Sequence, residues 1–352
     1  MDTIIPKALK KGDTIAFISP SARLNEILPA PLERGKLYLE SLGFCVQIIF
    51  SNQTTATIAD SIRVRCEEIH AAFRDSTIGA IICTIGGAHA NELLPFLDYS
   101  LIRSNPKIFV GYSDTTFLHY AIQSQTGLRT FYGPSVLTDF SDFPKPIQLT
   151  VDHFIRVLTE GEKSVGPLPR SSICSKEHSD FLLSKGVLDK PREIVDSPSW
   201  RWLRRGRATG YLFGGTVPCV VRLQGTQYAP SSWKDKILFL QSAMGDNLQL
   251  PYSVSQFRNN LVDLALSGIL HEIRGLVVGR GYKYNTDMQK ELANVILEVF
   301  EVIVGRSREE FPILMNVDFG HTSPFLTLPI NALVKLDSDL DEFSVLEPGV
   351  QA

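Results

Sequence analysis

The sequence predicts an α/β protein, and three observations support this prediction. Apolar runs of strand length alternate with segments of helical spacing throughout the first half of the chain. These runs are continuously apolar, which is typical of strands in a mostly parallel sheet that helices cover on both faces. The chain has 352 residues, 44% of them hydrophobic, which suffices for two domains with cores of their own. The first half is therefore predicted to be a doubly wound sheet.

Strands and helices of the first half are predicted in alternation. The predicted strands are Thr14–Ser19, Cys45–Phe50, Ile78–Ile85 and Lys107–Tyr112. The segments with helical spacing or helix starts are Glu26–Leu42, Asp60–Phe73 and Asn91–Leu97. Strand–helix–strand order implies right-handed crossovers. Cys45 and Cys83 fall in these strands, so we expect both thiols to be buried as small hydrophobes.

The second half differs in content and is predicted to form a second α/β domain. From about Ser164 to Pro198 the chain is rich in Ser, Pro, Lys and Asp and lacks periodicity, as a linker would. We therefore predict an N-terminal domain over 1–165, a linker over 166–205 and a C-terminal domain over 206–352. The later elements are strands at Ile237–Leu240, Gly275–Gly279 and Pro312–Val317, helices at Ser255–Leu266 and Asp287–Val304, and a hairpin of Ala332–Leu336 with Glu342–Leu346.

Composition and charge exclude several classes of function. The formal net charge is −3, and the densest basic run, Arg201 to Arg207, is too short to indicate nucleic-acid binding. The N-terminus lacks a signal-peptide pattern, and no apolar stretch approaches the roughly 20 residues that cross a bilayer. The five cysteines are far apart and show no metal-binding spacing. We expect a cytoplasmic, metal-free protein that binds a small molecule rather than nucleic acid or membrane.

Two loops at the carboxyl ends of predicted strands are candidates for a site, because ligands of open α/β sheets bind there. One loop runs from Ile85 to Asn91 and contains the pair Gly86-Gly87. The other places Ser113 at the start of a helix, where backbone N–H groups and the helix dipole favour developing negative charge. The alternative is purely structural, since Ser or Asp before a helix is usually an N-cap and glycine pairs usually make turns.

A serine nucleophile needs a base, and His321 is the best candidate among the seven histidines. The apolar strand PILMNV leads directly into a turn-rich segment that contains His321, so this residue also follows the carboxyl end of a strand. His89 is a loop residue near the glycine pair and can touch a substrate. His119 is expected to be a packed helix residue and His271 a structural one.

Several blocks of the sequence resemble the LD-carboxypeptidase family of serine peptidases, particularly its microcin C immunity-type branch. The resemblance rests on LKKGDTIAFISPSA, on IGGAHANELLPFLDYSLIRSNPKIFVGYSDTTFLHYAI, on FYGPS, on SWRWLRRGRATGYLFGG, on KDKILFL and on NVDFGHTSP, in this order over nearly the whole chain. It implies an N-terminal doubly wound domain and a C-terminal α/β domain with a mixed sheet. It also implies a homodimer, no metal or cofactor, and a substrate that is a peptide or a peptide-like conjugate.

The same resemblance implies residue roles. The family's nucleophile falls on Ser113 and its histidine on His321, with oxyanion donors around Gly87 and at the amide of Asp114. Further candidates for substrate contacts are Gly86, Trp202 at the end of the predicted linker, Gly214 and Gly215. Trp200 and Trp202 have an alternative role in apolar packing.

One departure from the family matters for activity. The family's triad glutamate falls on Gln241, which keeps the shape and loses the charge. In a serine-protease triad, replacing the acid by its amide lowers turnover by about 10⁴. Three interpretations follow: Asp246 or Asp318 replaces the acid, Ser113 and His321 act as a dyad, or the pocket has lost hydrolysis. Thr216 is a second departure, where the family often has Asn.

The sequence thus predicts a serine hydrolase that cleaves a peptide or aminoacyl-conjugate amide, with Ser113 as nucleophile, His321 as general base and Gln241 in the place of the acid. The competing prediction is a non-hydrolytic biosynthetic enzyme, such as a cyclase, lyase or acyl-transfer enzyme on a secondary metabolite, or a ligand-binding protein.

Overall fold

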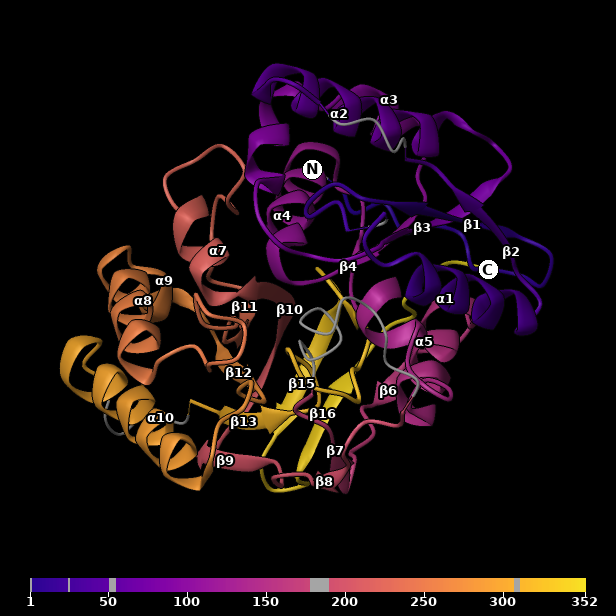
Figure 1. Ribbon diagram of the computed structural model, residues 1–352. Coiled ribbons are helices and arrows are strands. Elements are labelled where there is room, and N and C mark those ends of the chain that lie inside the picture. Colours follow the sequence, from indigo (N-terminus) through magenta and orange to yellow (C-terminus); the bar gives the residue numbers. More distant parts are fainter. Residues whose placement is uncertain (1, 25, 51–54, 178–189, 307–310) are drawn as a thin grey trace.

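The computed structural model describes residues 2–24, 26–50, 55–177, 190–306 and 311–352, and it confirms the α/β fold class (Figure 1). The N-terminal sheet is mostly parallel and has the strand order β14-β5-β4-β3-β1-β2. Its strands are β1 (Thr14–Ile18), β2 (Cys45–Ile48), β3 (Ile78–Cys83), β4 (Ile108–Gly111), β5 (Phe131–Tyr132) and β14 (Leu328–Pro329).

This strand order positions a crevice. Strand β2 pairs with one side of β1, and β3 pairs with the other side. The loops that follow β1 and β3 therefore leave the sheet in opposite directions, and a crevice opens between them at the carboxyl edge of the sheet. The apolar strands β1 and β3 are almost wholly buried, as their continuously apolar sequences predict.

The C-terminal sheet is mixed and has the order β6-β16-β15-β10-β11-β12-β13-β9. The four strands from β10 to β13 are parallel to one another, and the flanking pairs are antiparallel. The strands are β6 (Gly166–Pro167), β9 (Arg201–Arg204), β10 (Arg207–Thr216), β11 (Lys236–Gln241), β12 (Gly275–Gly279), β13 (Ile313–Val317), β15 (Leu333–Asp337) and β16 (Glu342–Val345). A separate two-stranded sheet pairs β7 (Ile173–Cys174) with β8 (Val195–Asp196).

Helices connect the parallel strands and cover the two sheets (Figure 1). In the first half they are α1 (Pro29–Ser41), α2 (Ile58–Arg74), α3 (Tyr99–Ser104), α4 (Thr116–Thr126) and α5 (Gln148–Thr159). In the second half they are α7 (Val217–Leu223), α8 (Val254–Leu266), α9 (Ile269–Glu272) and α10 (Thr286–Glu298). Short 3₁₀ turns form η1 (Ala90–Phe96) and η2 (Ser113–Thr115), and π-helical turns form η3 (Val136–Phe140) and η4 (Val299–Ile303).

Three sequence-based expectations need correction. Cys45 is exposed rather than buried, because β2 is an edge strand whose side chains are only partly covered. The segment Asn91–Leu97 forms a 3₁₀ turn rather than an α-helix start, and Pro95 within it cannot donate an α-helical hydrogen bond. The predicted helix Asp287–Val304 is α-helical only to Glu298 and continues as a π-helical turn.

The two sheets exchange segments across the predicted domain limits. β14 comes from the last part of the chain but pairs with β5 in the N-terminal sheet. The predicted linker contributes β6 and β9 to the C-terminal sheet, whereas its residues 178–189 lie outside the described residues. The chain end also returns to the N-terminal part, where Gln351 bridges to Lys7. The limits 1–165, 166–205 and 206–352 therefore stay a prediction.

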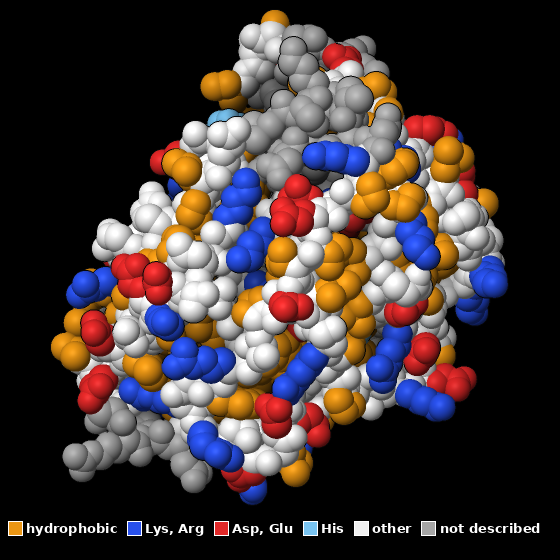
Figure 2. Space-filling model, turned by 60° about the horizontal axis from the view of Figure 1, so that its bottom comes forward, with side chains coloured by type: hydrophobic (Ala, Val, Ile, Leu, Met, Phe, Trp, Pro, Cys, Tyr) orange, Lys and Arg blue, Asp and Glu red, His pale blue; other side chains and the backbone are white. Residues whose placement is uncertain are grey.

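Two arginines of the basic run at Arg201–Arg207 pair with carboxylates of the C-terminal hairpin. Arg207 contacts Asp337 and Asp339 at 3.4 and 2.7 Å, and Arg205 contacts Asp339 at 3.2 Å. On the face shown in Figure 2, Lys and Arg side chains are interspersed with Asp and Glu. Within the described ranges, no helix combines the length and apolar character that membrane crossing requires.

Candidate active site

Ser113 occupies a strained turn between β4 and α4. Its backbone φ is 63°, in the left-handed region that residues with a side chain rarely adopt. Such strain costs on the order of 1–3 kcal/mol and persists where the surroundings impose it, commonly at functional sites. The turn is fixed by the Thr116 hydroxyl, which donates to the Ser113 carbonyl at 2.6 Å, and by the Ser113 amide, which donates to the Tyr132 hydroxyl at 3.3 Å.

His321 lies within hydrogen-bond distance of Ser113, although 208 positions separate them in the sequence. Its Nε2 is 3.0 Å from Ser113 Oγ, and its Nδ1 is 3.2 Å from the backbone carbonyl oxygen of Ser242. A carbonyl oxygen only accepts hydrogen bonds, so Nδ1 carries the proton and Nε2 acts as the acceptor toward Ser113 Oγ. The Ser242 carbonyl thereby selects the tautomer that a general base requires.

Burial keeps this imidazole neutral. Desolvation lowers the pKa of His321 to about 4, and the Ser242 carbonyl opposes that shift only in part. The residue is therefore a proton acceptor at neutral pH, and an imidazolium at this position would be poorly stabilised.

We expect the pH profile of kcat/KM to reflect this shift. Protonated His321 cannot take the Ser113 proton, so activity should rise as pH increases through the pKa of about 4 and stay constant between roughly pH 5 and 8. A profile of kcat/KM over pH 3.5 to 8, with stability checked at each pH, measures this. An inflection near 6.5, the value of an exposed imidazole, would contradict the buried neutral state.

Gln241 ends β11 beside this pair and is fully buried. Its side-chain amide donates to the hydroxyls of Tyr132 and Thr216, the latter at 2.8 Å. Its carbonyl oxygen accepts no hydrogen bond from the described residues and lies against Gly320, the neighbour of His321. Gln241 therefore holds a network of hydroxyls rather than the imidazole.

The two acidic candidates, Asp318 and Asp246, have other surroundings in this geometry. Asp318 forms a buried ion pair with Arg280 at 2.8 Å, and its other oxygen accepts from the indole of Trp200 at 2.6 Å. Desolvation raises the pKa of Asp318, and Arg280 opposes that rise. Asp246 is exposed on the loop after β11.

The glycine loop packs directly against the serine. A Cβ placed on Gly86 would lie 2.7 Å from Ser113 Cβ and 3.0 Å from its Oγ, so only glycine permits this approach. The Gly86 carbonyl accepts from the Ala22 amide at 3.1 Å, which joins the loops after β1 and β3. Gly87 has a φ of 133°, and a Cβ there would collide with Ala22 at 2.5 Å.

Replacing Gly86 by alanine should therefore lower kcat by about 100-fold or more, because a displacement of about 1 Å at the nucleophile has effects of that size. Gly79→Ala is the matched control on β3, the strand before this loop, where the added carbon meets the end of the Leu9 side chain at 3.1 Å and lies in ordinary contact with Asp13 at 3.6 Å. Steady-state kinetics of both variants, with circular dichroism to verify folding, measures the difference. Equal activity of the two variants would contradict the close approach.

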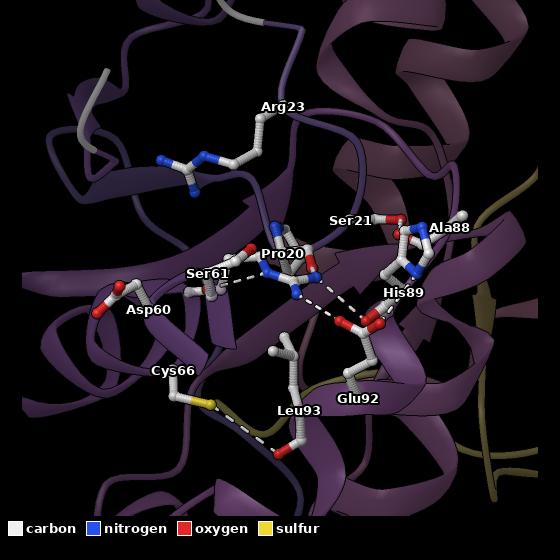
Figure 3. A network of polar contacts seen from close by, with 12 residues as sticks. Pro20, Ser21, Arg23, Asp60, Ser61, Cys66, Ala88, His89, Glu92 and Leu93 are labelled. Atoms are coloured by element: carbon white, nitrogen blue, oxygen red, sulfur yellow. Dashed lines mark hydrogen bonds and ion pairs between the residues drawn. The ribbon is translucent and has the colours of Figure 1, made fainter. Parts of the chain in front are cut away.

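A buried clamp holds the glycine loop in place (Figure 3). The Arg65 guanidinium, whose side chain is only 4% exposed, donates to the carbonyls of Pro20 and His89 and pairs with Glu92 at 2.9 Å. From the other side, the Asp114 carboxylate accepts from the Ser21 hydroxyl and from the Ala90 amide. The two charged groups thus fix the loops after β1 and β3 relative to the Ser113 turn.

Ser113 and His321 open into a cavity of about 410 Å³. The described residues that line it carry no Lys, Arg, Asp or Glu side chain and come from the loops after β1, β3, β4, β11 and β13 and from η3. They are Ala22, Leu24, Ile85, Gly86, Gly87, Tyr112, Ser113, Thr138, Ala243, Met244, Gly245, Leu248 and His321.

Some predicted site residues lie elsewhere. Trp202 is on the edge strand β9 and donates its indole N–H to Asp341 at 2.7 Å, so the structure does not bring it to this cavity. Gly214 and Gly215 instead allow β10 to approach its neighbours, since a Cβ on Gly215 would meet Thr116 at 2.5 Å. His89 is mostly exposed and pairs with Glu92, outside the cavity lining.

Two parts of the site were not predicted from the sequence. The backbone carbonyl of Ser242 carries no sequence signal, because any residue supplies one. The loop with Ala22 and Leu24 follows the carboxyl end of β1, so the rule that selected the other two loops also applies to it. Among the described residues, no group of three or more His, Cys, Asp or Glu side chains is arranged to hold a metal ion.

Comparisons with known proteins find similarity over most of the chain. The model of the LD-carboxypeptidase N-terminal domain matches residues 15–133, and that of the LD-carboxypeptidase C-terminal domain matches residues 209–336. A putative carboxypeptidase of Vibrio cholerae is 29% identical over 98% of both chains. A probable murein peptide carboxypeptidase of Bacillus subtilis is 30% identical over 98% of this chain and 95% of its own.

One of the similar proteins has also been solved as a structure. The microcin C7 self-immunity protein MccF of Escherichia coli is 28% identical over 98% of this chain and 96% of its own. A solved structure of MccF in its wild-type apo state superposes with a TM-score of 0.87 at 27% identity, covering 99% of this chain and all of that one. MccF has also been solved in complex with aspartyl sulfamoyl adenosine, with a TM-score of 0.86 at 26% identity over 99% of this chain and 100% of the other.

Proposed function

The chain belongs to the LD-carboxypeptidase family of hydrolases, and we propose that it cleaves an amide bond in a small peptide or aminoacyl conjugate, with Ser113 as nucleophile and His321 as general base. The observation that carries the proposal is the 3.0 Å contact between Ser113 Oγ and His321 Nε2. The strained φ of Ser113 and the adjacent glycine loop support it further.

The proposed reaction follows from these contacts. His321 Nε2 takes the hydroxyl proton as Ser113 Oγ attacks the scissile carbonyl, and the amides of Gly87 and Asp114 stabilise the oxyanion. The imidazolium then gives its proton to the leaving nitrogen as the C–N bond breaks. Water, deprotonated by the same nitrogen, hydrolyses the acyl-serine and restores the enzyme.

In this proposal Gln241 stands at the position of the family's glutamate, and Ser242 supplies the acceptor for His321 instead. A carbonyl orients the imidazole as a carboxylate does, but it offers no charge to stabilise the imidazolium. We therefore propose a slower hydrolase built on a Ser113–His321 dyad. A homodimeric state, a cytoplasmic location and independence from metals stay predictions.

A second candidate is a non-hydrolytic enzyme or a ligand-binding protein. The observation that favours it is the Gln241 carboxamide, which is bonded to Tyr132 and Thr216 rather than to His321. A site with a neutral base and backbone donors also suits an enolate intermediate.

Turnover of a small substrate panel distinguishes the two candidates. The panel contains peptides that end in D-alanine and aminoacyl sulfamoyl adenosines, and mass spectrometry follows release of the terminal or aminoacyl residue. Release at a rate above that of buffer supports the hydrolase. Binding of a panel member without release of any product favours the second candidate.

A further inference from the structure

The cavity around Ser113 is apolar on both of its walls. The wall from the N-terminal half contains Leu24 and Ile85, and the wall from the C-terminal half contains Met244 and Leu248. Hydroxyls of Tyr112 and Thr138 bond to each other at 2.9 Å, which satisfies part of their hydrogen-bonding capacity within the protein. The cavity is of a size that holds a small ligand.

Several charged groups near the cavity are already engaged by the protein. Arg65 and Glu92 pair with each other, and the Asp114 carboxylate is occupied by Ser21 and Ala90. Arg23 pairs with Glu68 at 2.7 Å, and Figure 3 shows its side chain directed away from the loop of Ala88 and His89. None of the described residues that line the cavity is Lys, Arg, Asp or Glu, so a charged substrate group would have no such partner in the lining.

The loop after β11 holds its apolar side chains over the site. Met244 bridges to Pro251, and the Gly245 amide donates to the Leu250 carbonyl at 3.0 Å. The Leu248 carbonyl accepts from the Tyr282 hydroxyl at 2.8 Å. These bonds anchor the loop in the conformation that closes the cavity wall.

We propose that the substrate's acyl residue, which contributes the scissile carbonyl, carries an uncharged apolar side chain. This inference rests on the proposed function, because the attacked carbonyl must lie within about 3 Å of Ser113 Oγ. The side chain of that residue is attached at the next carbon and so falls within the cavity. Burial against aliphatic walls favours it, whereas an unpaired charge pays a large desolvation cost there. The structural relative MccF has been solved in complex with aspartyl sulfamoyl adenosine. The proposal therefore predicts that this chain prefers a different acyl residue from the aspartyl group of that ligand.

A series of aminoacyl sulfamoyl adenosines with leucine, asparagine, aspartate or lysine tests the proposal. Calorimetric binding to Ser113→Ala is measured first, because this variant cannot consume the ligand. We expect leucine to bind about 30-fold or more tightly than aspartate or lysine, with asparagine between them. Equal or tighter binding of aspartate or lysine would overturn the proposal, and so would binding of all four no tighter than adenosine itself.

Two further measurements test whether the Met244 wall causes the ligand preference and whether the ligand is hydrolysed. Met244→Lys should reduce the preference for leucine over aspartate at least tenfold, whereas the volume-conserving control Met244→Leu should retain it. A preference unchanged in Met244→Lys would overturn the assignment to this wall. Hydrolysis of the series by the unaltered protein tests the proposed function separately: a leucine preference in binding without any turnover contradicts hydrolysis and leaves the ligand preference standing.

Discussion

Replacing Ser113 by alanine should lower kcat/KM by about 10³-fold or more, the largest loss we expect from any single change. The alanine removes the hydroxyl oxygen that lies beside both His321 Nε2 and the glycine loop. In hydrolases with an activated serine, removal of the nucleophile leaves only the contribution of the oxyanion donors and of substrate binding. His321→Ala should give a loss of similar size, because the two residues act as a unit.

The matched control is Ser124→Ala on helix α4, where the hydroxyl bonds only within the same helix among the described residues, to the Ala121 carbonyl and the Gln125 amide. Steady-state kinetics on the best substrate of the panel, together with thermal melting of each variant, separates lost chemistry from lost folding. If Ser113→Ala is folded and keeps the activity of Ser124→Ala, the nucleophile is another group and the proposed mechanism is wrong.

Replacing Gln241 by glutamate should raise kcat, by a factor between about 10 and the roughly 10⁴ that an acid-to-amide change costs in a serine-protease triad. A carboxylate at this position lies next to the His321 loop, since the present side-chain oxygen is against Gly320. Its charge stabilises the imidazolium and raises the pKa of His321 from about 4. The hydroxyls of Tyr132 and Thr216 can rotate to donate to it.

The pH profile makes this expectation specific. The low-pH inflection of kcat/KM should move upward in Gln241→Glu, because a nearby negative charge favours the protonated imidazole. Gln241→Met is the matched control, since it keeps the approximate volume but has neither the charge nor the bonds to Tyr132 and Thr216. A Gln241→Glu protein with unchanged kcat, unchanged inflection and unchanged melting would show that His321 gains nothing from a carboxylate at this position.

Much of the fold was predictable because its signals are local. Continuously apolar runs marked β1, β3 and β4, and each proved to be a buried strand of the parallel sheet. Such a run reports on the burial of its own residues. It does not report on the position of the strand in the sheet, and Cys45 on the edge strand β2 is exposed for that reason.

The candidate site was predictable to the extent that strand ends mark it. Ser113 and His321 each follow a buried strand, and the structure brings them within 3.0 Å of each other. Trp202 was selected from a sequence block rather than from a strand end, and it lies on an edge strand away from the cavity.

The sequence by itself therefore determined the α/β class, the alternation of its elements, and the turns that carry Ser113 and His321. These features depend on the burial and backbone preferences of neighbouring residues. Only the tertiary structure decided that the Ser242 carbonyl faces His321 and that the Gln241 amide turns to Tyr132 and Thr216. It also decided that Asp318 is committed to Arg280. The physical reason is that a hydrogen-bond partner is selected by distance and direction among residues far apart in the chain, and no local pattern encodes that choice.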